Sequence, residues 1–332
     1  MDPRYKSRFN DAVLAEAARR FGAQPGGLAA LDGFESFIYE FDLKTGGANA
    51  LPAILRVGHS NRRPEPLVLG EAEWINYLHA GGCPVARALP SQAGRLVEAI
   101  DDGQGEQFIV TAFEKAPGRH ARHADITPGI VEAWGALLGR IHALSVRYQP
   151  RYPRPHFDDP IMLSVESALP PSESGVLARY HELRGVLADL PRGDPTAYGM
   201  IHQDAHAGNF FIDPAAGAIT LFDFDDCCYS WYANDIAIVF FYASMGVEPA
   251  QFKTFFAEPF LRGYRSAFSI SPDWLATIPH FLKLREIDLY AAIHRSFDVT
   301  HLDDEPWVKG YMSGRKEKIE AGLPYLEPEY LP

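Results

Sequence analysis

The chain has 332 residues, 47% of them hydrophobic and 22% charged, which is enough apolar material for one large core or two lobes. Its formal net charge of −12 argues against a nucleic-acid or anionic-membrane partner, because such partners need clustered Lys and Arg. The three cysteines have no CxxC spacing, the N-terminus has no signal-peptide pattern, and no apolar run is long enough to span a membrane. These observations predict a cytoplasmic protein.

The first third of the chain carries alternating signals for helices and strands. The expected elements are a helix at 10–21 capped by Asn10, a strand at 34–43, a turn at Thr45-Gly46-Gly47, a paired strand at 53–57, a helix at 69–79 and apolar runs at 95–100 and 107–113. The alternation of Phe37, Tyr39 and Phe41 places these three rings on one face of a sheet. This part therefore predicts an antiparallel sheet with helices packed on it.

Strand signals become rare after Pro117 and Gly118, while residues 131–144, 176–190 and most segments beyond 236 show helical periodicity. A Pro- and Asp-rich region at 148–171 predicts an irregular excursion. We therefore expect an α+β protein that divides into residues 1–113 and 114–332.

The stretch MIHQDAHAGNFFIDPAAGAITLFDFDD, from Met200 to Asp226, concentrates polar groups at both ends of a predicted hairpin. Two strand-like runs at 209–212 and 219–222 are joined by turn residues. Because the ends of a hairpin lie close together, we expect Asp204, Asn209 and Asp223 in one neighbourhood.

His202, Asp204 and Asn209 have the HxDxxxxN spacing of a kinase catalytic loop, and Asp223 follows as a second acidic residue. In that pattern Asp204 is the catalytic base for the acceptor hydroxyl, and Asn209 and Asp223 bind Mg²⁺, since a triphosphate needs hard oxygen ligands around its metal. Two alternatives stay open: a chance polar turn, and a metallohydrolase in which His202, Asp204 and His206 face one metal.

These residues resemble the aminoglycoside phosphotransferase and choline kinase family, nearest its homoserine-kinase-like and stress-response Ser/Thr kinase branch. IHQDAHAGNFFID followed by LFDFDD carries the resemblance, with further matches in LGEAEWINYLHAGGCPV and LDGFESFIYEF. It implies a bilobal protein-kinase-like fold with a small antiparallel-sheet lobe and a larger, mainly helical lobe, and ATP or GTP bound with Mg²⁺ between them. Residues 1–113 would be the nucleotide-binding lobe, and 114–332 would hold the catalytic loop and the acceptor site.

The resemblance also implies a nucleotide site. Glu71 would hold a basic strand residue toward the phosphates, and Arg56 stands where a Lys is expected. Ser36, in the run Gly33 to Phe37, would belong to a turn that covers the phosphates. The alternatives are an ordinary surface ion pair for Arg56 and Glu71, and an ordinary hairpin turn around Ser36.

Three further assignments follow from the same resemblance. The backbone of Thr111, Ala112 and Phe113 would read a purine edge, although a plain buried strand has the same sequence pattern. Asp235 would brace the catalytic loop, with a helix N-cap as the alternative. His142, on a helix beneath that loop, is interpreted as a core residue without a chemical role.

The acceptor is the least determined part. Asp225, Asp226, Tyr229 and Trp231 follow the metal-binding Asp, and acidic and aromatic groups there would suit an amine-bearing alcohol through charge pairing and cation–π contact. The same residues would also fit a solvated face and a core.

The sequence thus favours a kinase that phosphorylates a hydroxyl of a small, amine-bearing metabolite or antibiotic. A protein Ser/Thr kinase of the stress-response type is the alternative, and a catalytically silent nucleotide-binding scaffold, suggested by Arg56, is the third hypothesis. The expected partner is a small-molecule acceptor, with no nucleic acid and no membrane, and the oligomeric state is left open.

Overall fold

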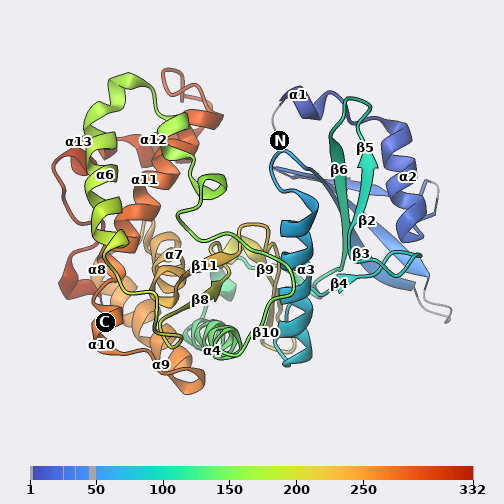
Figure 1. Cartoon of the computed structure of the whole chain (residues 1–332). Coiled ribbons are helices and arrows are strands. Elements are labelled where there is room, and N and C mark those ends of the chain that lie inside the picture. Colours follow the sequence, from blue (N-terminus) through green and yellow to red (C-terminus); the bar gives the residue numbers. More distant parts are fainter. Residues whose placement is uncertain (1–2, 25, 34, 45–49, 332) are drawn as a thin grey trace. The chain divides into compact units, whose positions relative to one another are not determined.

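The structure, a computed structural model, describes residues 3–24, 26–33, 35–44 and 50–331. The chain divides into two units, each described by itself below (Figure 1). Unit 1 comprises Met1–His120, Arg147–Arg154 and Phe210–Asp225, and unit 2 comprises Ala121–Val146, Pro155–Asn209 and Asp226–Pro332. The assignment of a nucleotide-binding lobe to 1–113 and an acceptor lobe to 114–332 concerns ligands and stays a prediction.

Unit 1 is built on an antiparallel sheet. Its elements are α1 (Pro3–Lys6), α2 (Asp11–Phe21), β1 (Ala29–Leu31), β2 (Phe37–Lys44), β3 (Ala50–His59), α3 (Glu65–Ala80), β4 (Ala88–Leu89), β5 (Glu98–Asp101), β6 (Gln107–Glu114), β7 (Arg119–His120), β9 (Phe210–Asp213) and β10 (Ala218–Leu221). The main sheet has the order β1-β2-β3-β6-β4, and β5 also pairs with β6. A second sheet has the order β10-β9-β7.

Helix α2 covers one face of the main sheet. Asn10 caps it as predicted, because its side chain accepts the backbone N–H groups of Ala12 and Val13 at 3.0 and 3.2 Å. The rings of Phe37, Tyr39 and Phe41 pack with α2 in one apolar cluster. The alternation along β2 therefore leaves its even-numbered residues, and their partners on β3 and β6, on the opposite face.

The predicted hairpins are present where they fall on described residues. β2 pairs with β3 from Phe37 opposite Val57 to Lys44 opposite Ala50, and β9 pairs with β10 from Ala218 opposite Asp213. The predicted turn Thr45-Gly46-Gly47 lies outside the described residues. Because β10 ends at Leu221, the residues from Phe222 to Asp225 leave the hairpin as an irregular segment.

Unit 2 is mainly helical. Its helices and strands are α4 (Pro128–Ser145), α5 (Val165–Ala168), α6 (Ser174–Ala188), β8 (Tyr198–Ile201), β11 (Cys228–Trp231), α7 (Tyr232–Ser244), α8 (Pro249–Gln251), α9 (Glu258–Ala267), α10 (Pro272–Leu275), α11 (Ile278–Ser296), α12 (Pro306–Met312) and α13 (Arg315–Glu320). Short 3₁₀ turns and one π-helical segment, Phe252–Ala257, connect them. The predicted α+β class is confirmed.

The helices of unit 2 pack closely around α7, which is buried along most of its length. Helices α4 and α9 approach so tightly that a Cβ at Gly135 would lie 2.0 Å from the Phe260 carbonyl oxygen, and one at Gly263 would lie 1.9 Å from that of Glu132. Glycine at both positions is therefore a requirement of this crossing. β8 pairs antiparallel with β11, with Ile201 opposite Cys228 and Tyr198 opposite Trp231, so the catalytic loop leaves β8 beside the start of β11.

The part of the chain that the structure describes contains no helix long and apolar enough to cross a membrane.

Candidate active site

The catalytic loop of unit 2 follows β8 and is held by Asp235 of α7. The fully buried Asp235 carboxylate accepts the backbone N–H of His202 at 2.9 Å and that of Gln203 at 2.8 Å. Gln203 has a φ of 71°, and among the described non-glycine residues one other has a positive φ. Such conformations persist where surrounding contacts impose them. The bracing role of Asp235 is confirmed. The N-cap alternative is wrong, because the Asp235 carboxylate oxygens accept N–H groups of the catalytic loop.

His142 lies next to the Asp235 carboxylate, and both nitrogens of its ring have hydrogen-bond partners. Its Nε2 is 3.2 Å from Asp235 Oδ2 and its Nδ1 is 2.7 Å from the Tyr264 hydroxyl, and the imidazole is fully buried. Burial lowers the pKa of His142, and Asp235 offsets this in part. A neutral ring with both nitrogens engaged is a structural residue, so the interpretation of His142 as a core residue is confirmed.

Asp204 is surrounded by groups of its own loop. Asn209 Nδ2 donates to both the backbone oxygen and the Oδ2 of Asp204, each at 2.9 Å. His206 Nδ1 accepts the Gly208 N–H at 2.9 Å, which leaves Nε2–H facing Asp204 Oδ2 at 3.3 Å. His202 is buried and its Nδ1 accepts the N–H of Asp204. Both histidines thus serve the loop.

The metallohydrolase alternative finds no support in this geometry. In the described part of the chain, the side chains close enough to share a metal are His59, Asp102 and Glu106 of unit 1, and none comes from the catalytic loop. The Arg8 guanidinium already pairs with both of those carboxylates, at 2.5 and 2.9 Å.

Arg285 of α11 is the residue near Asp204 that the motif did not reveal. Its Nη2 donates to Asp204 Oδ1 and, at 2.7 Å, to the Tyr242 hydroxyl, and its guanidinium lies 5.1 Å from the centre of the Tyr242 ring. Burial raises the pKa of Asp204, but the cation of Arg285, the His206 hydrogen bond and His202 outweigh it, so the pKa lies well below its usual range. Asp204 is therefore an ionised carboxylate at neutral pH and a weak base, which can accept a hydrogen bond from a hydroxyl group.

Asn209 presents an oxygen that suits a hard cation. Because its amide nitrogen is turned to Asp204, Oδ1 points elsewhere, and this oxygen accepts no hydrogen bond from any residue that the structure describes. The side chain is nevertheless largely buried. An amide oxygen that is held in place and accepts no hydrogen bond is a suitable ligand for Mg²⁺ or Ca²⁺.

Asp223, in unit 1, is the other non-glycine residue with positive φ, at 62°. It is exposed, while the next residue, Phe224, is fully buried and packs edge-on against Trp74 at 5.4 Å between ring centres. The buried ring anchors the segment, so the unusual backbone turns the Asp223 carboxylate outward. An exposed carboxylate on an anchored backbone is suited to bind a cation.

Arg56 and Glu71 form a buried, bidentate ion pair. Nη1 donates to Oε1 at 2.8 Å and Nη2 to Oε2 at 2.6 Å, and Glu71 is 1% exposed. The guanidinium also lies 5.0 Å from the centre of the Phe113 ring. The pairing expected from the family resemblance is confirmed, and the alternative of an ordinary surface pair is wrong.

Thr111 and Phe113 lie within β6, where the backbone is paired with β3 and β4. Thr111 is opposite Arg56, which in turn is opposite Ile38, so the three residues form one row across the sheet. The buried Thr111 Oγ1 has no hydrogen-bond partner among the described residues.

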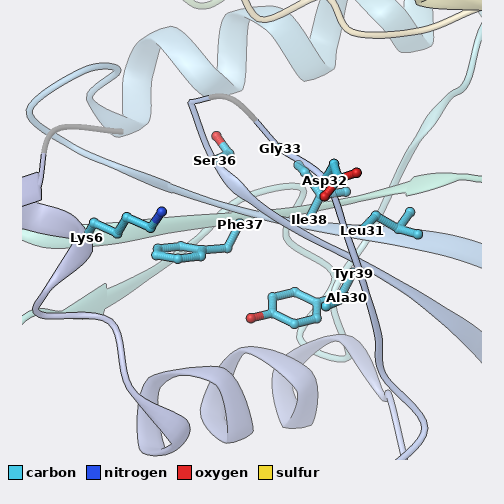
Figure 2. Close-up of a pocket in the computed structure, with 9 residues that line it drawn as sticks. All are labelled: Lys6, Ala30, Leu31, Asp32, Gly33, Ser36, Phe37, Ile38 and Tyr39. Carbon is cyan, nitrogen blue, oxygen red and sulfur yellow. The ribbon is translucent and has the colours of Figure 1, made fainter. Parts of the chain in front are cut away.

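Ser36 directly precedes β2, in a loop of which Phe34 is outside the described residues. A Cβ at Gly33 would lie 2.3 Å from the Ser36 carbonyl oxygen, so the loop closes on itself too tightly for a side chain there. A pocket of about 250 Å³ opens beside it, and Figure 2 shows its lining: Lys6, Ala30, Leu31, Asp32, Gly33, Ser36, Phe37, Ile38 and Tyr39. Lys6, from α1, brings a cation to this loop that the sequence pattern did not indicate.

The four residues proposed to contact the acceptor have different surroundings. Asp225 belongs to unit 1, where Arg62 Nη2 donates to its Oδ2 at 2.6 Å and Arg56 lies 3.8 Å from its Oδ1. Trp231 is fully buried and its indole N–H donates to the Pro191 carbonyl, so it has no surface to offer an acceptor. Tyr229 and Asp226 are half-buried, and Tyr229 stacks on His156.

A braced loop that carries Asp204 and Asn209, together with a buried pair between Arg56 of β3 and Glu71 of α3, is typical of a kinase-type phosphotransferase. Residues 30–272 match the model of the phosphotransferase enzyme family, and the chain belongs to this family. It is 34% identical over 322 residues to the amicoumacin kinase of Bacillus subtilis (strain 168), covering 95% of this chain and 93% of that protein.

Two solved structures extend the comparison. The amicoumacin kinase hAmiN, solved in complex with AMP-PNP, Ca²⁺ and Ami, has a TM-score of 0.91 at 34% identity and covers 99% of each chain. A microcompartment-associated aminopropanol kinase has a TM-score of 0.72 at 23% identity, over 93% of this chain and 97% of that one, and indicates the fold alone. The predicted family, the kinase-like fold and the kinase activity are confirmed.

Proposed function

We propose that this kinase transfers the γ-phosphoryl group of ATP to a hydroxyl of a small, amine-bearing metabolite or antibiotic, with Mg²⁺ as its divalent cation. The observation that carries the proposal is Asp204: an ionised carboxylate, fixed by Asn209 and Arg285, on a loop braced by Asp235. Support for the ligands comes from the 34% identical relative, an amicoumacin kinase, and from the similar structure that holds AMP-PNP and Ca²⁺.

Asp204 acts on the acceptor hydroxyl. One carboxylate oxygen accepts the hydroxyl proton while the hydroxyl oxygen forms its bond to the γ-phosphorus and the bond to the β,γ-bridging oxygen breaks. The products are ADP and a phosphate monoester, and the proton passes from Asp204 to solvent. Because the pKa of Asp204 lies below its usual range, Asp204 orients the hydroxyl first and takes its proton late in the transfer.

Asn209 Oδ1 and the Asp223 carboxylate are the proposed metal ligands, since one accepts no hydrogen bond and the other is turned outward on an anchored backbone. When bound, Mg²⁺ neutralises the charge that develops on the phosphate oxygens.

Arg56 is proposed to grip the phosphates from the fixed position that Glu71 gives it. Of the five guanidinium N–H groups, two are used by Glu71, so the others can donate to phosphate oxygens. Ser36, Thr111 and Phe113 would contact the rest of the nucleotide.

The test is an assay of the purified protein with Mg-ATP or Mg-GTP and a panel of hydroxyl compounds: amicoumacin, 1-amino-2-propanol, glucosamine and generic protein substrates. Phosphorylated product is identified by mass spectrometry. We expect a small-molecule product that Asp204→Ala reduces at least about 1,000-fold, whereas Asp273→Asn, which removes an exposed carboxylate of unit 2, leaves the rate unchanged.

The other two hypotheses predict different products. Label in the protein substrates alone would favour the protein kinase. Absence of ADP and of any phosphorylated product would favour the silent scaffold and overturn the proposed function.

A further inference from the structure

The Asp204 carboxylate has one acceptor position that no described residue fills. Its Oδ2 receives two donors, Asn209 Nδ2 at 2.9 Å and His206 Nε2 at 3.3 Å. Its Oδ1 receives a single donor, Arg285 Nη2. A carboxylate oxygen accepts about two hydrogen bonds, so the acceptor hydroxyl of the proposed reaction binds at Oδ1, beside the Arg285 guanidinium.

The hydroxyl of Tyr242, on α7, shares the same guanidinium nitrogen. Arg285 Nη2 donates one hydrogen to Asp204 and the other to Tyr242 Oη, at 2.7 Å. Because Tyr242 accepts in this bond, its own O–H points away from Arg285. That O–H donates to no residue in the part of the chain that the structure describes. Tyr242 is half-buried, so its hydroxyl keeps access to a ligand.

Tyr242 is a fixed hydrogen-bond donor beside the catalytic loop. Burial and the negative charge of Asp204 raise its pKa against the opposing Arg285 cation, so the hydroxyl keeps its proton at neutral pH. Its ring lies 4.6 Å from the His206 ring, and its oxygen is bound to Arg285. Polar groups in such places normally have partners, and a site built to hydrogen-bond a substrate group rejects compounds that lack it.

The two open positions lie close enough for one small molecule. The hydrogens of an NH₂ group diverge by roughly 120°, so two oxygens bound to Arg285 Nη2 are about 4.5 Å apart. Two oxygens on adjacent carbons, each about 2.7–2.8 Å from its partner, fit between such points. All these groups belong to unit 2.

We propose that Tyr242 binds the acceptor by donating its O–H to an oxygen on the carbon next to the hydroxyl that Asp204 Oδ1 orients. This inference rests on the proposed function, and it narrows the acceptor to compounds with oxygens on two adjacent carbons. Arg285 is then the positioning residue that sets the spacing between the two contacts.

The test uses two acceptors that differ by a single oxygen. 3-Amino-1,2-propanediol and 1-amino-2-propanol share the amine and the 2-hydroxyl, and the diol alone has an oxygen on the other neighbouring carbon. Steady-state kinetics with Mg-ATP are measured for wild type, Tyr242→Phe and Tyr325→Phe. Tyr325 is the matched control, because it is also half-buried and its hydroxyl donates to α7, to the Phe241 carbonyl at 3.4 Å.

We expect wild type and Tyr325→Phe to have a KM about 5- to 10-fold lower for the diol, the contribution of one hydrogen bond between neutral groups. Tyr242→Phe should give equal KM values for the two acceptors, with the KM of ATP unchanged. If Tyr242 only supported Arg285, the substitution would instead change both acceptors alike and keep their ratio.

Each outcome decides the inference. Equal KM values in wild type, or a lower KM for 1-amino-2-propanol, overturn it and leave the proposed function intact, and this measurement needs no variant. A preference for the diol that survives in Tyr242→Phe also overturns it. The same holds if neither compound is a substrate or a competitive inhibitor while another hydroxyl compound is phosphorylated. Absence of product from every compound refutes the proposed function, and the inference with it.

Discussion

Replacing Asp235 with Asn tests whether the brace beneath the catalytic loop is required for both stability and catalysis. The carboxylate now accepts two backbone N–H groups, at 2.9 and 2.8 Å, and lies 3.2 Å from His142 Nε2. An amide has a single acceptor oxygen, so one of these buried donors would face an NH₂ group instead.

The size of the effect follows from these contacts. Leaving a buried donor unsatisfied costs about 1–3 kcal/mol, and the remaining hydrogen bonds lose their charge assistance. We therefore expect Asp235→Asn to lower the free energy of unfolding by about 3–5 kcal/mol, the range for removing one partner of a buried charged group. The positive φ of Gln203 loses the contacts that impose it, and a displacement of about 1 Å at Asp204 would reduce kcat about 100-fold.

Urea unfolding followed by tryptophan fluorescence measures the first quantity, and steady-state kinetics below the melting temperature measure the second. Asp194→Asn is the matched control, because Asp194 also accepts a backbone N–H, at 2.8 Å, but in an exposed turn; we expect a loss of about 1 kcal/mol or less. An Asp235→Asn protein that unfolds like the control, or that keeps its kcat, would refute the reasoning.

Three further predictions address the charged groups of the two units. Glu71→Gln releases Arg56 from its ion pair and should therefore raise the KM of ATP about 10-fold or more, while the KM of the acceptor, measured in the same steady-state assay, stays unchanged. An unchanged KM of ATP would mean that Arg56 does not belong to the nucleotide site. Arg285→Ala removes the main cation that lowers the pKa of Asp204, so the acid limb of the pH–kcat profile should move to higher pH, and an unmoved limb would contradict that assignment. Burial raises the pKa of Asp288 to about 6, so the ionised carboxylate destabilises the folded protein, and this cost grows as the pH rises through that value. Asp288→Asn should therefore raise Tm more at pH 7.5 than at pH 5. An equal change in Tm at the two pH values would mean that the carboxylate is paired.

Several features could be read from the sequence because they depend on residues close together in the chain. The Asn10 cap, the alternation of Phe37 to Phe41 and the hairpin between Asp213 and Ala218 are local properties. The same holds within the catalytic loop, where Asp204 and Asn209 are five residues apart and joined by a hydrogen bond. Spacing alone therefore predicted these elements and the kinase chemistry.

Other features depend on which distant side chain reaches a given point, and spacing carries no information about that. Arg285 reaches Asp204 across 81 positions of sequence, and Asp235 reaches His202 across 33. Trp231 follows the proposed metal ligand closely, yet it is buried, because β11 pairs with β8 and turns its ring into the core. Asp288 looks in sequence like any acid on a helix. Only the packing of α6, α7 and α11 leaves its carboxylate half-buried without a partner among the described residues, because burial and pairing are properties of the assembled core.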